Sequence, residues 1–252
     1  MSLFFKKKNQ QVFVNTADER TLHKNLDFTA AEQYKLLRTN LDFTLPHGEK
    51  CPVIGVTSSM RGEAKSTTSI NLSYVLAEKG KRVLLIDGDL RLPSVAKKLG
   101  IKNEVGLTEF LVGRGSSAKM NFNSDILDNW FILPSGRIPP NPSELLGSPR
   151  MKAILNDLRE YFDYIVIDLP PVNIVSDAIS VSSMISGMVV VVREEYCEKR
   201  ELAHCVRQLE LSNVNILGFV MTGTDLGGGT YGKKYKYYKD DSKDDSKEGN
   251  VD

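Results

Sequence analysis

Long apolar runs are missing from this sequence of 252 residues. No stretch approaches the roughly 20 consecutive apolar residues of a transmembrane helix, so the sequence predicts no membrane span. The first residues, MSLFFKKKNQQ, carry no apolar core of a secretory signal, and we expect none. An excess of charge is missing as well, because the formal net charge is only +1. Bulk electrostatics therefore gives no reason to expect a nucleic-acid partner.

Cysteine is scarce and its spacing is uninformative for metal binding. The three cysteines, Cys51, Cys197 and Cys205, are far apart and odd in number. This usage fits a reducing cytoplasm better than a disulfide framework. None of them forms a CxxC pair or a Cys/His ligand pattern, so structural zinc is not predicted.

Short β-rich runs alternate with helical runs between Pro52 and Thr222. The β-rich runs lack polar alternation, as parallel strands buried on both faces do. Strands joined by helices imply right-handed crossovers. The sequence thus predicts an α/β fold with a mostly parallel central sheet and helices on both faces. The expected strands cover 52–58, 82–89, 163–171, 188–194 and 213–223, and the expected helices 65–80 and 199–211.

The two ends of the chain differ from this alternating centre. TAAEQYKLLRTNLDF reads as a helix, with Thr29 as its N-cap and Glu32 completing a capping box. The end is Gly-rich, then Tyr/Lys-rich, then charged, without Leu, Ile or Phe after Leu226. Such a segment cannot bury enough apolar surface to fold alone. We predict an N-terminal segment (1–28), a domain (29–226) and a flexible tyrosine-rich tail (227–252).

TSSMRGEAKST, from Thr57 to Thr67, approximates the phosphate-loop pattern G-x-x-x-x-G-K-[ST]. Ser59 and Ala64 stand at its two glycine positions. A predicted strand leads in and a predicted helix leads out, which is the context that a phosphate loop requires. Its backbone N–H groups and the helix N-terminus would face the phosphates. We predict cofactor contacts from Ser59, Met60, Arg61, Gly62, Glu63, Ala64, Lys65, Ser66 and Thr67.

Three acidic residues follow predicted buried strands. Asp87 and Asp89 follow the apolar run of LLIDGDLR, and Asp168 follows that of YIVIDLPP. Ligands of open α/β sheets bind outside the carboxyl ends of the strands, so these acids should converge near the loop. Together they predict a magnesium–nucleotide site in a P-loop NTPase-like fold.

Phosphoryl transfer requires that the reacting groups are positioned in line and that the charge of the phosphates is neutralised. These two requirements suggest a role for each predicted site residue. Lys65 would reach the terminal phosphates. Ser66, Asp89 and Asp168 form the expected Mg²⁺ set. Asp87 is the candidate proton acceptor, and the predicted catalytic set is Lys65, Asp87 and Asp89. Arg91, two residues after Asp89, could pair with a phosphate or with an acid.

The motifs EAKST, LLIDGDLR and YIVIDLPP closely resemble those of the bacterial tyrosine kinases of capsule and exopolysaccharide operons, of the CpsD/CapB type. They stand where that family has its phosphate loop, its second Walker motif and its Walker B motif. GLTEFLVG and LPSGRIPPNPSELLGSPRM are also similar to stretches of the family. The resemblance covers nearly the whole chain. It implies ATP and Mg²⁺ as cofactors and a protein-tyrosine kinase that regulates polysaccharide synthesis and export.

YGKKYKYY resembles the C-terminal tyrosine cluster of that family. The resemblance implies autophosphorylation between neighbouring subunits, with Tyr231, Tyr235, Tyr237 and Tyr238 as acceptors. Composition alone would equally allow a segment that sticks to nucleic acid or to a membrane surface. Each phosphate would add roughly −1.5 to −2 charges to a tail that now carries several lysines.

EQYKLLR resembles the E-x-x-R-x-x-R oligomerisation helix of the family. Glu32, Lys35 and Arg38 lie on one side of a helix, which by spacing alone also fits a solvated face. The resemblance implies a ring-like homo-oligomer. It also implies a membrane-spanning activator on a separate chain, which would hold the kinase in the cytoplasm at the inner face of the membrane.

Several positions depart from the pattern of the family. Arg61 stands where Pro is common, and Thr222 where Asn is expected. Ala64 is harmless if its φ is negative, but costs roughly 1 kcal/mol or more if its φ is positive. Two alternatives stay open. One is a ParA/MinD-type ATPase, although Met60 replaces the signature lysine of that class, and the other is a non-catalytic nucleotide-binding scaffold subunit.

Overall fold

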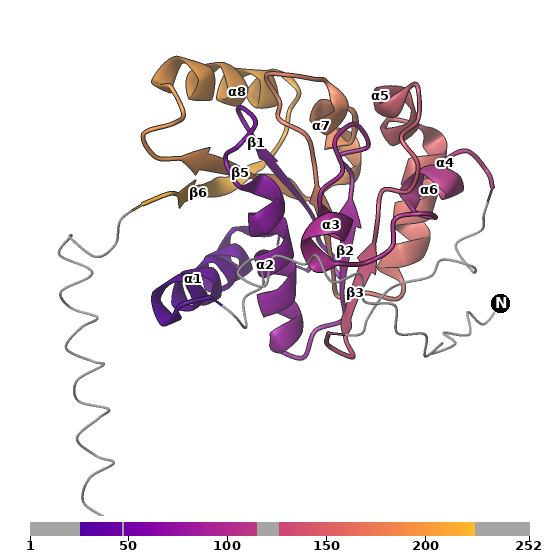
Figure 1. The fold of residues 1–252 in the computed structure, drawn as a ribbon, viewed down its shortest axis with the longest axis horizontal. Helices are drawn as coiled ribbons and strands as arrows, with labels where there is room; N and C mark the ends of the chain where they lie inside the picture. The colour runs from indigo at the N-terminus through magenta and orange to yellow at the C-terminus, as the bar shows by residue number, and fades with distance from the viewer. Residues whose placement is uncertain (1–25, 47, 115–125, 225–252) are drawn as a thin grey trace, which may run out of the picture.

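A computed structural model describes residues 26–46, 48–114 and 126–224. In these ranges the chain forms a six-stranded sheet with the order β3-β2-β4-β1-β5-β6 (Figure 1). Each neighbouring pair of strands is parallel. The strands are β1 (Val53–Ser58), β2 (Val83–Asp87), β3 (Trp130–Leu133), β4 (Tyr164–Asp168), β5 (Gly187–Arg193) and β6 (Ile216–Thr222). The predicted α/β class and the parallel sheet are confirmed.

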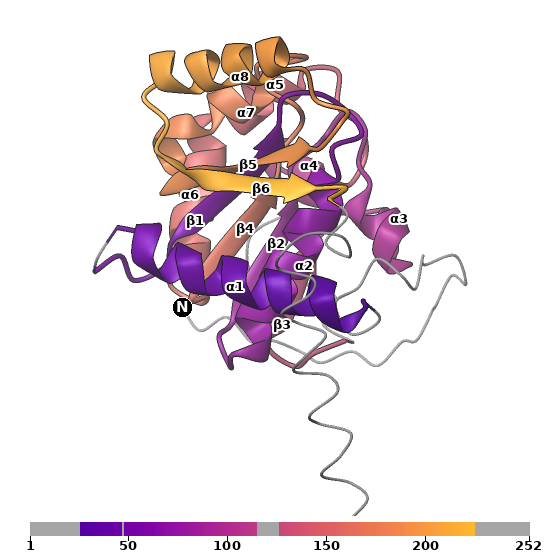
Figure 2. The ribbon, with the colours of Figure 1, turned by 90° about the vertical axis from the view of Figure 1, so that its left-hand side faces the viewer.

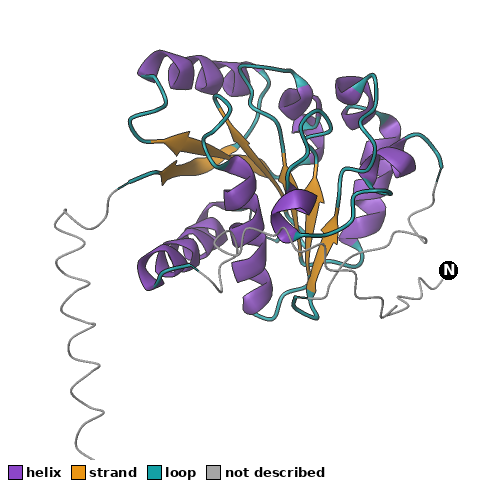
Figure 3. Ribbon diagram, viewed as in Figure 1, coloured by secondary structure: helices purple, strands orange, loops and turns teal. Residues whose placement is uncertain are grey.

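Helices cover both faces of the sheet, as the sequence predicted (Figures 2 and 3). Helices α1, α2 and α3 lie on one face, and α6, α7 and α8 lie on the other. The helices are α1 (Phe28–Thr44), α2 (Lys65–Glu78), α3 (Val95–Leu99), α4 (Leu107–Leu111), α5 (Pro142–Leu146), α6 (Pro149–Arg159), α7 (Asp177–Ser180), the 3₁₀-helix η4 (Ser182–Met184) and α8 (Lys199–Leu211).

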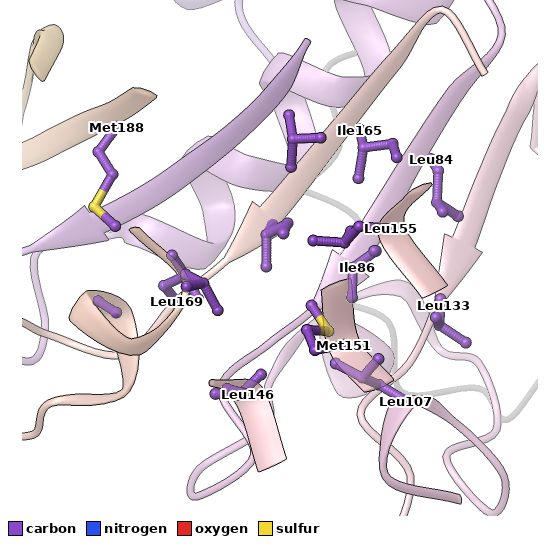
Figure 4. Close-up of a cluster of buried hydrophobic side chains, with 14 of the residues drawn as sticks. Leu84, Ile86, Leu107, Leu133, Leu146, Met151, Leu155, Ile165, Leu169 and Met188 are labelled. Atoms are coloured by element: carbon purple, nitrogen blue, oxygen red, sulfur yellow. The ribbon is translucent and has the colours of Figure 1, made fainter. Parts of the chain in front are cut away.

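The sheet separates two hydrophobic cores, because successive strand side chains point to opposite faces. Leu84 and Ile86 of β2 enter the core under α6 and α8 (Figure 4). Leu85, between them, enters the core under α1 and α2. Every residue of β1 and β2 is buried. This burial on both faces explains why the strands read as unbroken apolar runs and holds their carboxyl ends rigidly in place.

Helix α1 begins two residues earlier than its predicted cap implies, and that cap is wrong. Asp27 is the N-cap, and its Oδ1 accepts a hydrogen bond from the Ala30 N–H at 2.9 Å. Thr29 lies inside the first turn. Asp serves at an N-cap at least as well as Thr, and the backbone of Asp27 has the extended conformation that is typical of an N-cap residue. Glu32 therefore does not close a capping box and instead contacts Lys35 at 2.7 Å.

Helix α2 ends as predicted, since Gly80 adopts a left-handed φ of 85° just beyond its C-terminal cap. Strand β3 was not predicted. It is only four residues long and pairs with β2 at the edge of the sheet. The indole N–H of Trp130 donates to Ser73 Oγ of α2 at 3.0 Å. A run this short carries too little periodicity to be recognised.

Most of the predicted N-terminal segment and the whole predicted tail lie outside the described residues, so the division of the chain stays a prediction. Tyr231, Tyr235, Tyr237 and Tyr238 also lie there. Within the described ranges, no helix has both the length and the apolarity needed to cross a bilayer.

Candidate nucleotide site

The carboxyl ends of three adjacent strands form the candidate site. Strand β4 lies between β2 and β1, and in register Asp168 pairs with Asp87 on one side and with Val56 on the other. Lys65 Nζ, at the start of α2, lies 2.8 Å from Asp89 Oδ2 and 3.6 Å from Asp168 Oδ1. The predicted convergence of the loop lysine with the acids is thus confirmed in the geometry.

Gly88 makes this convergence possible, although its role was not predicted from the sequence. Its N–H donates to the Asp168 carbonyl oxygen at 2.8 Å. A Cβ at this position would lie 2.8 Å from Ile167 Cγ2 and 2.9 Å from the Asp168 oxygen. Any side chain would therefore push the ends of β2 and β4 apart. The glycine between Asp87 and Asp89 was a visible signal for such a close approach.

Lys65 is the cation of the site, and its side chain is only 13% exposed. Burial alone would lower the pKa of its ammonium group. The carboxylates of Asp168 and Asp89 more than offset that effect and leave the pKa of Lys65 raised. The lysine therefore stays charged and its Nζ is held at the end of the sheet, where a phosphate would meet it.

Asp87 and Asp168 are fully buried neighbours on adjacent strands. Burial raises the pKa of Asp87 well above its ordinary value, and repulsion from Asp168 adds to the rise. Burial also raises the pKa of Asp168, although Lys65 opposes it. The Asp87 carboxylate accepts backbone N–H bonds from Asp89 at 3.3 Å and from Val95 at 3.1 Å. These bonds fix its orientation, while its pKa suits proton transfer closer to neutral pH than an ordinary Asp.

The donor set fits a hydrated divalent cation bound together with phosphates. Asp168 Oδ2 is buried without a hydrogen-bond partner among the described residues. Such an orphaned carboxylate oxygen is unusual unless another group completes it. Ser66 lies beside Lys65, with its Oγ 3.4 Å from Nζ. Nowhere in the described ranges do three or more His, Cys, Asp or Glu side chains form a metal-binding group, so a cation here would depend on phosphate and water oxygens.

The phosphate loop ends at Ala64, whose φ of 67° and ψ of 23° are left-handed. The φ of Ala64 is therefore positive, which is the case in which an alanine is strained. Helix α2 begins at Lys65 directly after it. The N–H groups of a first helical turn have no acceptor within their helix, so those of Lys65, Ser66 and Thr67 suit an anion.

Other strands hold the outer side of this loop. Thr222 Oγ1, at the end of β6, donates to the Glu63 carbonyl oxygen at 3.1 Å. Arg193 Nη1, at the end of β5, donates to the Gly62 carbonyl oxygen at 3.2 Å and stacks over the ring of Tyr196. Thr222, which replaces the expected Asn, is therefore a loop anchor in this structure.

Arg91, whose partner the sequence left open, and Arg61, a predicted cofactor contact, have different surroundings. Arg91 forms a two-bond ion pair with the buried Asp177, at 2.9 and 3.0 Å, so the acid rather than a phosphate is its partner here. Arg61 is exposed and lines a cleft beside Asp89 and Leu92. Asp89, which pairs with Lys65, is the acid that lines this cleft.

The three charged residues of the predicted oligomerisation motif do not form one cluster. Glu32 and Lys35 pair with each other on α1, and both are partly exposed. Arg38 Nη1 instead donates to the Val75 carbonyl oxygen of α2 at 2.6 Å. Arg38 therefore helps to seat α1 on its own domain.

Comparison with known proteins is consistent with this site. A family described as AAA domain matches residues 51–216. Tyrosine-protein kinase YwqD of Bacillus subtilis (strain 168) is 38% identical over 210 residues, which cover 82% of this chain and 86% of that protein. Tyrosine-protein kinase CpsD of Streptococcus pneumoniae serotype 4 is 36% identical over 212 residues, which cover 83% and 92%.

Solved structures give the same picture. The kinase domain of the Escherichia coli tyrosine kinase ETK superposes with a TM-score of 0.76 at 28% identity, covering 87% of each chain. The septum site-determining protein MinD from Pyrococcus horikoshii OT3 reaches a TM-score of 0.58 at 24% identity, covering 68% of this chain and 70% of that one, which shows a common fold alone. The stronger likeness favours the kinases over the ParA/MinD-type alternative. This chain belongs to the bacterial tyrosine kinases of capsular and exopolysaccharide biosynthesis.

Proposed function

We propose that the protein transfers the terminal phosphoryl group of ATP to tyrosines of its own tail, in a neighbouring subunit, through the site around Lys65. The observation that carries the proposal is the placement of Lys65 Nζ between Asp89 and Asp168, at the N-terminus of α2. A buried cation and free helix N–H groups together favour a polyphosphate.

Each residue of the site would have one role in phosphate binding, Mg²⁺ binding or proton transfer. Lys65 and the N–H groups of the first turn of α2 would hold the phosphates. Ser66, Asp89 and Asp168 would hold Mg²⁺, which neutralises phosphate charge when bound. The Asp87 carboxylate, oriented by two backbone N–H bonds, would accept the proton of the attacking tyrosine hydroxyl.

The acceptor tyrosine would approach over the small recess beside Asp89, whose free volume of about 10 Å³ admits a water-sized group but no ring. Its lining combines apolar side chains, which suit an aromatic ring, with two arginines. Leu92 and Ile174 are 54% and 40% exposed there. The lining residues are Arg61, Asp89, Arg91, Leu92, Pro170, Pro171, Ile174 and Val175.

The remaining parts of the proposal concern assembly. Glu32 and Lys35 of α1 are partly exposed and would contact the next subunit of a ring-like homo-oligomer. A membrane-spanning activator on a separate chain would keep the kinase in the cytoplasm at the inner face of the membrane. Through tail phosphorylation the protein would regulate synthesis and export of a capsular or exopolysaccharide.

Mixing two complementary variants tests transfer between subunits. A Lys65→Met chain keeps its tail tyrosines, and a second chain carries Phe at Tyr231, Tyr235, Tyr237 and Tyr238. With ATP and Mg²⁺, we expect phosphotyrosine on the Lys65→Met chain only in the mixture. Labelling of the four-Phe chain would place the acceptors elsewhere, and an unlabelled mixture of folded chains would rule out transfer in trans.

Calorimetry with ADP and Mg²⁺ tests the nucleotide site itself, which a kinase and a nucleotide-binding scaffold subunit would share. We expect binding by the wild type and much weaker binding by Lys65→Met, because the variant lacks the buried cation. A folded wild type that binds no nucleotide would contradict both, whereas nucleotide binding without tyrosine phosphorylation would favour the scaffold.

A further inference from the structure

We propose that Ser59 and Glu63 form a positioning pair that holds the phosphate loop in its nucleotide-binding shape. The proposal rests on the nucleotide site proposed above. It assigns to Ser59, which breaks the glycine pattern, a task that a glycine could not perform. Neither side chain needs to touch the nucleotide, because both act through the backbone of the loop.

The contacts within the loop carry this inference. Glu63 is completely buried, and its two carboxylate oxygens lie 3.1 and 2.9 Å from Ser59 Oγ. Oε2 also accepts the Met60 N–H at 2.7 Å. Among the described residues Glu63 has no salt bridge, so neutral donors compensate its burial, and the Cys197 thiol beside it is a further one. A buried carboxylate that loses a donor becomes costly to keep in place.

The position of Glu63 in the chain explains how the pair can orient the start of α2. Its carbonyl oxygen is held by Thr222 of β6, and the next residue is the left-handed Ala64. The side chain of Glu63 is thus fixed by Ser59 and Met60, and its backbone carbonyl by Thr222. The peptide that follows Glu63 leads directly into the first turn of α2. Anchoring Glu63 therefore sets the direction of the N–H groups that would face the phosphates.

Ser59 is itself held in place by its surroundings. It is completely buried, and Cys197 Sγ lies 3.1 Å from its Oγ on the side of the segment that follows β5. Glycine at position 59 would match the loop pattern better, yet it would remove the hydroxyl that Glu63 accepts. The structure thus makes an unusual prediction, since restoring the pattern should weaken nucleotide binding.

The test measures ADP affinity by calorimetry on full-length variants. We expect Ser59→Gly and Ser59→Ala each to raise the dissociation constant of ADP by about tenfold, the usual effect of losing a bond to a charged group. Glu63→Gln should weaken binding too. The double variant Ser59→Ala/Glu63→Gln should bind less weakly than the product of the single effects predicts, because the two residues share one interaction.

Ser73→Ala is the matched control for a general loss of stability. Ser73 is also completely buried and accepts the Trp130 indole N–H, but it lies on α2 away from the loop. We expect it to lower the melting temperature without changing ADP affinity.

Steady-state kinetics of the Ser59 variants provides a second readout, because it separates effects on KM from effects on kcat. The Ser59 variants should raise KM for ATP more than they lower kcat, as loss of ground-state binding does.

Three results would overturn the pair. The first is unchanged or tighter ADP binding by both Ser59 variants. The second is weaker ADP binding by Ser59→Gly but not by Ser59→Ala, which would indicate an effect of backbone flexibility. The third is an equal loss of ADP affinity in Ser73→Ala. Failure of the proposed function would look different, because the wild type itself would then bind no ADP.

Discussion

Replacing Ala64 by glycine should stabilise the protein, although position 64 lies in the centre of its candidate site. Ala64 has a φ of 67°, and its side chain is exposed, so the methyl group forms no buried contact worth keeping. An L-residue in the left-handed region bears a penalty of roughly 1–2 kcal/mol, which glycine escapes. Part of this gain is lost, because glycine gives the unfolded chain about 0.4–1 kcal/mol of additional freedom.

The net expectation for Ala64→Gly is a gain of about 1 kcal/mol in the free energy of unfolding. For a chain of this size that corresponds to a rise of about 2–4 °C in melting temperature. Thermal unfolding should be followed without nucleotide, since a bound nucleotide adds its own stabilisation.

The same substitution at Ala203 provides the control. Ala203 is exposed within α8, where glycine should lower stability by about 0.5–1 kcal/mol. Opposite signs at the two positions would confirm that backbone geometry decides the outcome. An unchanged or lower melting temperature for Ala64→Gly would refute the conclusion that Ala64 is strained.

Three further predictions concern the acids and helix α1. Lys65→Met should lower the unfolding free energy by about 3 kcal/mol at pH 8 in denaturant titrations, and by less at pH 5. The reason is that burial raises the pKa values of the neighbouring Asp87 and Asp168 carboxyls, which therefore take up protons as the pH falls and leave less negative charge uncompensated. The acid limb of the kcat/KM profile should lie above the ordinary pKa range of Asp, because burial raises the pKa of Asp87. Asp87 is active only when deprotonated, so activity is lost as the pH falls through this pKa. Asp87→Asn should remove the acid limb and lower kcat at least about 100-fold. Replacing Glu32, Lys35 and Arg38 by Ala should lower the mass seen by light scattering, and an unchanged mass would refute an oligomeric role for α1.

The architecture was predictable because its physical signals are local. Unbroken apolar runs marked five of the six strands, and the acids at their ends could be assigned to one edge of the sheet. The approach of Lys65 to Asp168 was therefore predictable from the sequence. The end of α2 was equally visible, since Gly80 is a residue that tolerates the left-handed region.

The remaining features depend on contacts between distant segments. The φ of Ala64 is imposed by the loop and its anchors on β5 and β6, which no local pattern reveals. Arg91 could have met a phosphate, and only the packing of α7 supplies Asp177 instead. At α1, two good capping residues compete within three positions, and the sequence pattern favoured Thr29 over Asp27. In each case tertiary context decided between locally equivalent choices.

Intact-mass spectrometry with and without ATP and Mg²⁺ tests the central claim most directly. The account predicts that the wild type gains one or more phosphoryl groups, all of them on tyrosine, and that Asp87→Asn gains none under the same conditions. A wild type that hydrolyses ATP without gaining mass would contradict the account. A folded Asp87→Asn variant that becomes phosphorylated as fast as the wild type would remove Asp87 from the mechanism.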